Sequence, residues 1–309
     1  MKRKDGAAAW MVYALARVLI GVLRVFPVNW NLRTARVFAR VWWYVLPRHR
    51  RRACAHIRMA CGPDLSDREV ERMALRSLEA LAMLAIDFIF LPLLVNERTW
   101  GRYIRLHNLR DALRSMLDGK GALLLTPHFG NWELAGYLLA LFGFDVAAIM
   151  RPLDNVYLNR YVVDVRRRTG LELIDKKGAM ENAEDILARG GALGFIADQN
   201  AGSKGLFVDF FGIKASTYKS IGLLAMTRDV PIIVGYALRL DNRFRFEVGV
   251  ERVIHPAEWQ NRDDPLRWVT QEFTNAMEAS IRRAPEQYLW IHRRWKSRPK
   301  GEKPLPAIA

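Results

Sequence analysis

A histidine and a glutamate stand five residues apart in the segment Thr126-Pro-His-Phe-Gly-Asn-Trp-Glu133. On one continuous α-helix, this spacing would point the two side chains about 140° apart, so they cannot be two ligands on one helical face. If His128 instead lies in a turn before the helix, with Gly130 giving the backbone freedom to bend, the carboxylate can reach back to one imidazole nitrogen. A carboxylate placed there fixes the tautomer and stabilises the imidazolium, which leaves the other nitrogen free as a general base. The spacing therefore predicts that His128 acts as a base and that Glu133 orients it.

The elements around this segment indicate an α/β fold. From about residue 100, short apolar runs that fit buried strands alternate with helical stretches. The expected strands are 121–126, 145–150, 171–174, 192–197, 231–240 and 243–250, and the expected helices are 133–141, 157–169, 181–188, 219–227 and 265–283. This alternation predicts a central, mostly parallel sheet flanked by helices, with ligands beyond the carboxyl ends of the strands. His128 follows the end of the first expected strand, where a site is expected.

The N-terminal segment has the composition of a membrane-facing helix. An apolar stretch from Ala7 to Val28 follows Met1-Lys-Arg-Lys4, and it contains Arg17 and Arg24, which lie two turns apart and therefore on one helical face. The stretch is long enough to cross a bilayer as a tilted helix, but a helix lying in the interface with its arginines toward phosphates fits it better. An ordinary buried helix is the alternative. A cleaved signal peptide is not expected, because no small-x-small site follows.

Further segments extend this N-terminal region. Residues 30–60 combine aromatic side chains with a basic cluster at 48–52, as a segment at headgroup depth requires, although a solvated basic face would have the same composition. A helix is predicted to begin at the capping sequence Ser66-Asp-Arg-Glu69, to continue through the apolar run 78–95, and to end or kink at Pro92. We expect residues 1–98 to form a helical, membrane-anchoring or interfacial region. We expect residues 99–309 to form the α/β catalytic region, and both regions to belong to one continuous domain.

The composition limits the partners and the compartment. The chain has 48 Lys plus Arg against 32 Asp plus Glu, and its net charge of +16 favours anionic partners. The positive charge is dispersed and no nucleic-acid motif is recognisable, so nucleic acid is not an expected partner. Cys54 and Cys61 are the only cysteines. Seven helical residues separate their Cα atoms by roughly 10 Å, too far for a disulfide, which favours a reducing, cytoplasmic setting. No zinc spacing, Walker A loop, GxGxxG fingerprint or GxSxG elbow occurs, and no metal is expected.

Several blocks of the sequence resemble one family. His-Phe-Gly-Asn-Trp-Glu at 128–133 matches the HX4(D/E) motif of the lysophospholipid acyltransferase superfamily, and its wording is similar to the lipid A biosynthesis late acyltransferases, the lauroyl and myristoyl transferases. Four further blocks follow in the order of that family: Arg151-Pro-Leu-Asp-Asn155, Ala197-Asp-Gln-Asn200, Gly205-Leu-Phe-Val-Asp-Phe-Phe-Gly212 and His292-Arg-Arg-Trp-Lys296. The similarity spans roughly residues 7–298, so it is far more specific than the HX4E motif alone.

This resemblance implies a glycerolipid-acyltransferase-like α/β fold on the cytoplasmic face of the cell inner membrane. It implies an acyl-acyl carrier protein as the donor substrate, a hydroxyl of lipid A or its precursor as the acceptor, and neither a metal nor another cofactor. On this basis His128 deprotonates the acceptor hydroxyl as it attacks the thioester carbonyl, while Glu133 orients His128. A covalent enzyme intermediate is not needed.

Five other residues are candidates for substrate binding. Arg151 follows the second expected strand, and its guanidinium could bind a lipid phosphate or stabilise oxyanion charge, with an ion pair at the strand end as the alternative. Asp198 and Gln199 end another expected strand and could position the acceptor or cap a turn. Asn131 and Lys219 are weaker candidates, and neither is expected to be catalytic.

Two other functions stay open. The first keeps the chemistry and changes the acceptor to a glycosylated phosphatidylinositol or another lysolipid, with acyl-CoA as a candidate donor. The second is a basic membrane-surface binding protein without catalysis, for which salt-sensitive liposome binding and no thioester consumption would argue.

Overall fold

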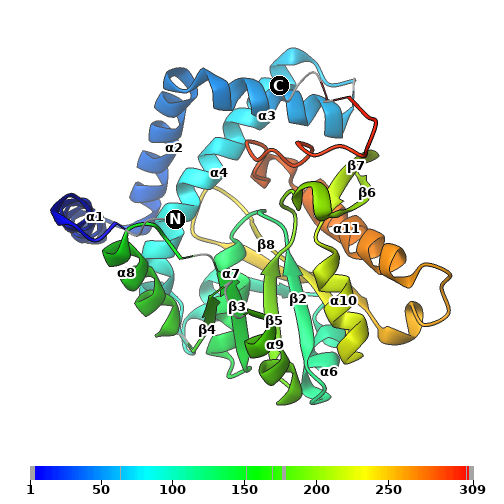
Figure 1. Ribbon diagram of the computed structural model, residues 1–309. Helices are drawn as coiled ribbons and strands as arrows, with labels where there is room; N and C mark the ends of the chain where they lie inside the picture. Colours follow the sequence, from blue (N-terminus) through cyan, green and yellow to red (C-terminus); the bar gives the residue numbers. More distant parts are fainter. Residues whose placement is uncertain are drawn as a thin grey trace.

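A seven-stranded sheet forms the centre of the computed structural model, which describes residues 4–62, 64–150, 152–168, 170–175, 179–303 and 305, without the side chains of 175 and 179–181 (Figure 1). The strand order is β1-β9-β8-β2-β5-β3-β4. Strands β8 and β9 are antiparallel, and every other neighbouring pair in this described sheet is parallel. The strands are β1 (Ile104–His107), β2 (Ala122–Thr126), β3 (Val146–Met150), β4 (Glu172–Asp175), β5 (Ala192–Ile196), β8 (Ile232–Arg239) and β9 (Phe246–Ile254). The predicted α/β fold with a mostly parallel sheet is confirmed.

Helices cover both faces of the sheet. The helices α9 (Ala179–Ala188), α10 (Lys219–Arg228) and α11 (Pro265–Arg283) pack against one face around a large apolar core. The helices α6 (Arg110–Leu117) and α7 (Trp132–Leu141) pack against the other face, and α8 (Val156–Arg167) lies beside strand β4. A short helix, α5 (Trp100–Tyr103), leads into β1.

Four longer helices precede α5: α1 (Ala7–Val25), α2 (Val28–Val45), α3 (Pro47–Cys61) and α4 (Asp67–Leu94). Helix α4 begins at the predicted capping box, in which the Ser66 side chain accepts from the Glu69 amide and the Glu69 carboxylate accepts from the Ser66 amide. Pro92 lies in its last turn, two residues before the helix ends. Helix α2 packs along α4, where Arg36 and Arg40 both donate to Glu79.

A hairpin and the C-terminal segment complete the molecule. The hairpin strands β6 (Leu206–Phe210) and β7 (Ile213–Thr217) pack beside α11. Three short 3-10 helices, η1 (Gly202–Lys204), η2 (Pro256–Glu258) and η3 (Pro285–Gln287), lie in the connections. The segment after η3 buries two tryptophans, Trp290 and Trp295, in one apolar cluster with the hairpin, α3 and α4.

Two helices in the described part of the chain, α1 and α4, are long and apolar enough to cross a membrane. Half of the most apolar stretch of α4 is buried inside the protein, whereas only 6% of that of α1 is buried. Helix α1 projects from one side of the molecule (Figure 1). Exposed large side chains lie on both α1 and α2, and the set comprises Trp10, Met11, Val12, Leu15, Val18, Leu19, Val22, Val25, Phe26, Trp30, Val37, Phe38, Val41, Tyr44 and Val45. Exposed apolar side chains in this number are typical of a protein or membrane contact.

Candidate active site

His128 lies just beyond the carboxyl end of β2, and its partner comes from the neighbouring strand. Strands β2 and β5 pair in parallel with Thr126 opposite Ile196, so the residues two positions farther along, His128 and Asp198, leave the sheet side by side. His128 Nδ1 lies 2.7 Å from Asp198 Oδ1. The Asp198 residue is 1% exposed, so this carboxylate has little competition from water. The hydrogen bond fixes the orientation of the imidazole ring and directs Nε2 away from Asp198.

The turn after His128 is held by backbone hydrogen bonds. The Leu289 amide donates to the His128 carbonyl at 3.0 Å, and the Gly130 amide donates to the Gln287 carbonyl at 3.1 Å. Gly130 has φ +56°, and a Cβ atom there would lie 2.1 Å from the Ala237 carbonyl oxygen. The glycine is therefore required by both the positive φ and the close approach to β8.

Asn131 has a structural role in this turn. Its side chain caps α7 by accepting from the Leu134 amide at 3.1 Å, and it donates to the buried carboxylate of Asp87 on α4 at 3.1 Å. The same carboxylate binds Arg239 at the end of β8. Burial raises the pKa of Asp87, against the lowering effect of Arg239 and Asn131. This predicted substrate-binding residue thus fixes the position of the turn, and it does not line the cavity described below.

The charges around His128 favour its protonated form. Burial by itself lowers the pKa of the ring, but the charge and hydrogen bond of Asp198, together with the charge of Glu133, raise it above its ordinary value. The pKa of Asp198 falls to about 2, because the interaction with His128 outweighs the raising effect of burial. A neutral His128 can therefore take up a proton and be stabilised as the imidazolium.

The predicted hydrogen bond between Glu133 and His128 is wrong. Arg166 on α8 takes both oxygens of Glu133, with distances of 2.9 Å from Nε and 2.6 Å from Nη2. Glu133 is the second residue of α7, and from there its side chain meets the planar guanidinium across the gap to α8, a bidentate geometry that carboxylates favour. Glu133 still contributes its charge to His128, and its catalytic role stays a prediction.

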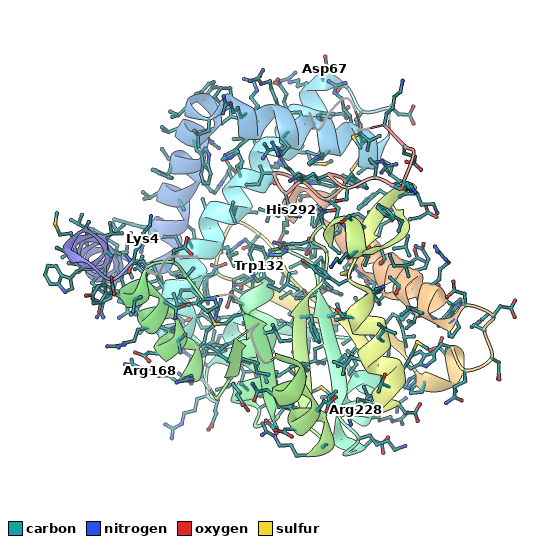
Figure 2. The ribbon with its side chains drawn as sticks, viewed as in Figure 1. Lys4, Asp67, Trp132, Arg168, Arg228 and His292 are labelled. Atoms are coloured by element: carbon teal, nitrogen blue, oxygen red, sulfur yellow. The ribbon has the colours of Figure 1, made fainter. Side chains whose placement is uncertain are left out.

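A cavity of about 490 Å³ lies on the far side of α8, and a larger one of about 720 Å³ opens at His128. The polar end of the larger cavity is formed by His128, Glu133, Arg166 and Gln199. Gln199 Nε2 lies 3.3 Å from His128 Nε2. Trp132 lies at the start of α7 (Figure 2). Its ring is edge-on to the imidazole of His128, with the ring centroids 5.0 Å apart.

The rest of the larger cavity, which we call the catalytic pocket, is apolar. It extends between the sheet and helices α6 and α7, and its walls include Leu109, Ala112, Leu113, Met116, Leu124, Leu139, Phe195, Ile233, Val248 and Val250. Ala112 packs in one apolar cluster with the first residues of β2, β3 and β5, whereas His128 follows the last residue of β2. The pocket therefore runs from a polar mouth at the carboxyl ends of the strands to an apolar end at their amino ends. Its shape and composition suit a long hydrocarbon chain.

The other predicted residues lie in different places. Asp198 and Gln199 come together at His128, as described above. Lys219 is exposed at the start of α10 and does not line the catalytic pocket. Arg151 lies outside the described residues. Among the described residues, no group of three or more His, Cys, Asp or Glu side chains could hold a metal ion.

Residues of the C-terminal segment bind the loop that follows Asp198 and the strand β7. Arg294 is 1% exposed and donates to the Ser216 carbonyl and to Thr217 Oγ1. His292 Nε2 accepts from the Asn200 amide at 3.2 Å, and burial lowers the pKa of His292 to about 4, so this second histidine is neutral. Figure 2 shows His292 above the carboxyl edge of the sheet, on the same side as Trp132.

The pairing of Arg166 with Glu133 and the pairing of Asp198 with His128 were not predicted from the sequence. Arg166 belongs to the run 166–168, which has the pattern of a solvated basic face, and the 33 residues that separate it from Glu133 give no periodic signal. The pairing of His128 with Asp198 could have been found, since both residues follow the ends of expected parallel strands.

Comparisons with known proteins agree on one family. The family described as bacterial lipid A biosynthesis acyltransferase matches residues 3–297. The lipid A biosynthesis palmitoleoyltransferase of Escherichia coli (strain K12) is 26% identical over 249 residues, which cover 79% of this chain and 78% of the relative. The lipid A biosynthesis lauroyltransferase of the same strain is 25% identical over 247 residues, covering 78% and 77%. The phosphatidylinositol mannoside acyltransferase of Mycolicibacterium smegmatis is 32% identical over 107 residues, covering 33% and 35%.

Proposed function

Since this chain belongs to the bacterial lipid A biosynthesis acyltransferase family, we propose that it transfers a fatty acyl group from an acyl carrier protein thioester to a hydroxyl of a lipid A precursor. One observation carries the proposal. The imidazole of His128, oriented by the buried Asp198, lies at the polar mouth of a long apolar pocket. A base at the mouth and space for a hydrocarbon chain behind it are what transfer of an acyl group to an alcohol requires.

His128 acts as a general base in this reaction. Its Nε2 takes the proton of the acceptor hydroxyl while the oxygen attacks the thioester carbonyl, and a tetrahedral oxyanion forms. The carbon–sulfur bond then breaks, and the imidazolium returns its proton to the leaving thiolate. The new ester and the free thiol of the donor are the products, with no covalent bond to the enzyme.

The carboxylates of Asp198 and Glu133 have different roles in this reaction. Asp198 fixes the ring and stabilises the imidazolium through its hydrogen bond to Nδ1. Glu133 holds Arg166 at the polar mouth and adds negative charge near His128. The guanidinium of Arg166 then stabilises the developing oxyanion, a contribution that a fixed cation makes best in a site with little water. Arg151 stays a candidate for a lipid phosphate.

The apolar surface of α1 and α2 supports a position on the membrane. Since the donor carrier is a cytoplasmic protein in our proposal, the active site faces the cytoplasm from the inner membrane. The anionic carrier and anionic lipids both suit a chain with a net charge of +16.

The test is an assay of the purified protein with a lipid A precursor and acyl carrier proteins loaded with different chain lengths. His128→Ala should lower the transfer rate by about 10²- to 10⁴-fold while the protein stays folded. His255→Ala is the matched control, because His255 pairs with Asp111 on the surface and does not line the catalytic pocket. Near wild-type transfer by His128→Ala would disprove the role of His128 as the base, and a wild-type protein that transfers no acyl group to the precursor would disprove the proposed function.

A second acceptor has a specific observation in its favour, the local similarity to a phosphatidylinositol mannoside acyltransferase. The match covers about a third of each chain, so we place it second. Offering both acceptors, with acyl carrier protein and with CoA donors, separates the two. Ester formation only on the mannoside would replace the first proposal, and vesicle binding without thioester consumption would indicate a non-catalytic membrane protein.

A further inference from the structure

The cavity on the far side of α8, about 490 Å³ in volume, is distinct from the catalytic pocket. Helices α1, α4, α7 and α8 supply its walls, and none of its lining residues lines the catalytic pocket. Helix α8 separates the two cavities, because Tyr161 and Val165 face one of them and Val162 and Arg166 face the other. We call this cavity the arginine pocket.

Four arginines and only one carboxylate line the arginine pocket. The arginines are Arg17, Arg24, Arg160 and Arg168, and the carboxylate belongs to Asp164. Within the described part of the chain, none of these five side chains makes an ion pair, although Asp164 is four residues from both Arg160 and Arg168 on one helix. The cavity therefore carries a net charge of three positive groups, and no carboxylate among the described side chains pairs with them.

The two arginines of α1 are directed into the arginine pocket by the helix period. Tyr13, Arg17 and Arg24 follow one another at spacings of four and seven residues and lie on one face. Arg17 donates to the Tyr13 hydroxyl at 3.1 Å, and its guanidinium lies 4.8 Å from the centre of the Tyr161 ring on α8. Most of the exposed apolar residues of α1, among them Leu15, Leu19 and Val22, lie on the opposite face, whereas Trp10 shares the face of the arginines.

Helix α1 is fixed to α8, so the arginine pocket is a built feature of the fold. The Lys4 amide donates to the Asp154 carbonyl at 2.8 Å, and the Asn155 side chain donates to the Ala9 carbonyl at 2.8 Å. The Tyr157 hydroxyl adds a bond to the Asp5 carbonyl at 2.8 Å. Figure 2 shows Lys4 where α1 meets α8 and Arg168 at the far end of α8.

We infer that the arginine pocket binds the phosphate group of a membrane lipid. Guanidinium groups match phosphate oxygens with paired donors, and Tyr13, Tyr157 and Tyr161 supply the aromatic rings found at headgroup depth. The apolar face of α1 lies on the other side of the same helix, so a helix resting in the membrane surface brings its arginines to the level of the phosphates. The phosphate belongs either to a surrounding phospholipid or to the acceptor itself.

The experiment uses two double variants of the full-length protein that remove equal charge. The pocket variant is Arg24→Gln with Arg160→Gln, and the control is Arg33→Gln with Arg167→Gln. All four arginines are exposed, and among the described residues none of them makes an ion pair. Arg167 shares α8 with Arg160, and Arg33 lies near the exposed Trp30 and Val37 on α2, so the control lies as close to the membrane.

Flotation with phosphatidylcholine vesicles, with and without a minor fraction of phosphatidic acid, measures binding. We expect the pocket variant to lose about 10-fold or more in affinity for the vesicles with phosphatidic acid, and the control to lose only a few-fold. Unchanged melting temperatures establish that both variants are folded. Equal losses in the two variants would overturn the inference. No loss of vesicle binding in the pocket variant would also overturn it if the KM for the acceptor, measured as described next, is unchanged as well.

A second measurement distinguishes the sources of the phosphate and rests on the proposed function. Transfer is followed in nonionic detergent without phospholipid, using a phosphorylated lipid A precursor. A KM for the acceptor that rises about 10-fold at constant kcat assigns the phosphate to the acceptor. An unchanged KM together with lost vesicle binding assigns it to a phospholipid. Because the vesicle measurement needs no acyl transfer, failure of the proposed function leaves its result interpretable.

Discussion

At the scale of single residues, two carboxylates act on one imidazole by different routes. Asp198 accepts a hydrogen bond from Nδ1, whereas Glu133 has both oxygens on Arg166 and affects His128 through its charge alone. Removing Asp198 therefore releases the ring from its orientation, while removing Glu133 releases a guanidinium at the pocket mouth. The two losses should differ in their pH dependence.

Asp198→Asn should lower kcat/KM and move its pH dependence. The base works when neutral, so activity rises with pH, and the midpoint lies above the ordinary histidine pKa of 6.5 because the pKa of His128 is raised. Without the Asp198 charge, burial remains and lowers the pKa, so the midpoint should move to lower pH. We expect a loss of about 10²- to 10⁴-fold on the plateau. A pH profile with the wild-type midpoint and rate would refute the role given to Asp198.

Glu133→Gln and Arg166→Gln should act as one unit. Each single change breaks the same bidentate pair, so the double variant should be no slower than the slower single variant. The kcat/KM values of the wild type, the two single variants and the double variant form a double-mutant cycle that measures this coupling. Fully multiplicative losses would mean that the two side chains contribute separately and that their pairing has no catalytic value.

The position of His128 could be predicted from the sequence, but its partner could not be chosen correctly. A histidine after a buried apolar run, followed by a glycine, indicates a base at a strand end. For Asp198 the sequence predicts a role in positioning the acceptor or in capping a turn. Its contact with His128 depends on which strands pair and in what register, which the sequence does not show. Glu133 is closer to His128 along the chain than Asp198 is, so the sequence favours it as the partner. The sequence does not show that Arg166, 33 residues away, pairs with Glu133 instead.

At the scale of helices and strands, the sequence predicts the elements whose burial produces a run or a regular spacing of apolar residues. The six apolar runs became β2, β3, β4, β5, β8 and β9, and the last expected helix matches Pro265–Arg283. Strand β1 was missed because only its first residue is buried, so it has no apolar run. The hairpin of β6 and β7 is not among the expected elements, because its two strands are short and lie between glycines; α11 packs against β6. The division of the chain at residues 98 and 99 stays a prediction.

The apolar end of the catalytic pocket should determine the preferred acyl chain length. Ala112 on α6 lines this end and is 4% exposed, so Ala112→Phe would fill space that the end of a long chain needs. Each methylene that no longer fits costs about 0.8 kcal/mol, so excluding two methylenes should lower kcat/KM for the longest accepted donor by about tenfold relative to shorter ones. A series of acyl carrier proteins with different chains measures this preference.

The matched control for that experiment is Leu117→Phe on the same helix. Leu117 is 74% exposed and does not line the pocket, so its donor preference should stay that of the wild type. An unchanged preference in folded Ala112→Phe would show that the acyl chain lies elsewhere.

At the scale of the whole molecule, Figure 1 shows α1, α2 and α8 on the side away from α11. Helices α1 and α2 carry the exposed apolar side chains, and α1 and α8 line the arginine pocket. This placement assigns two separate contributions to membrane binding, since apolar burial does not depend on lipid charge whereas the arginines do. Charge and apolar surface can therefore be tested independently on one helix.

Leu15→Glu with Leu19→Glu should release the protein from vesicles of any headgroup charge. The two leucines are 68% and 58% exposed and lie one helical turn apart on α1, so the change removes apolar surface without disturbing the core. Losing the burial of two leucine side chains costs about 3 kcal/mol or more, which corresponds to a loss in vesicle affinity of about 100-fold. Flotation with neutral phosphatidylcholine vesicles measures the effect, because the arginine pocket contributes least there. Leu117→Glu, at an exposed site on α6, should float like the wild type. If the α1 variant also floats normally, α1 does not bring this enzyme to the membrane, and the lipid would have to reach the arginine pocket by another route.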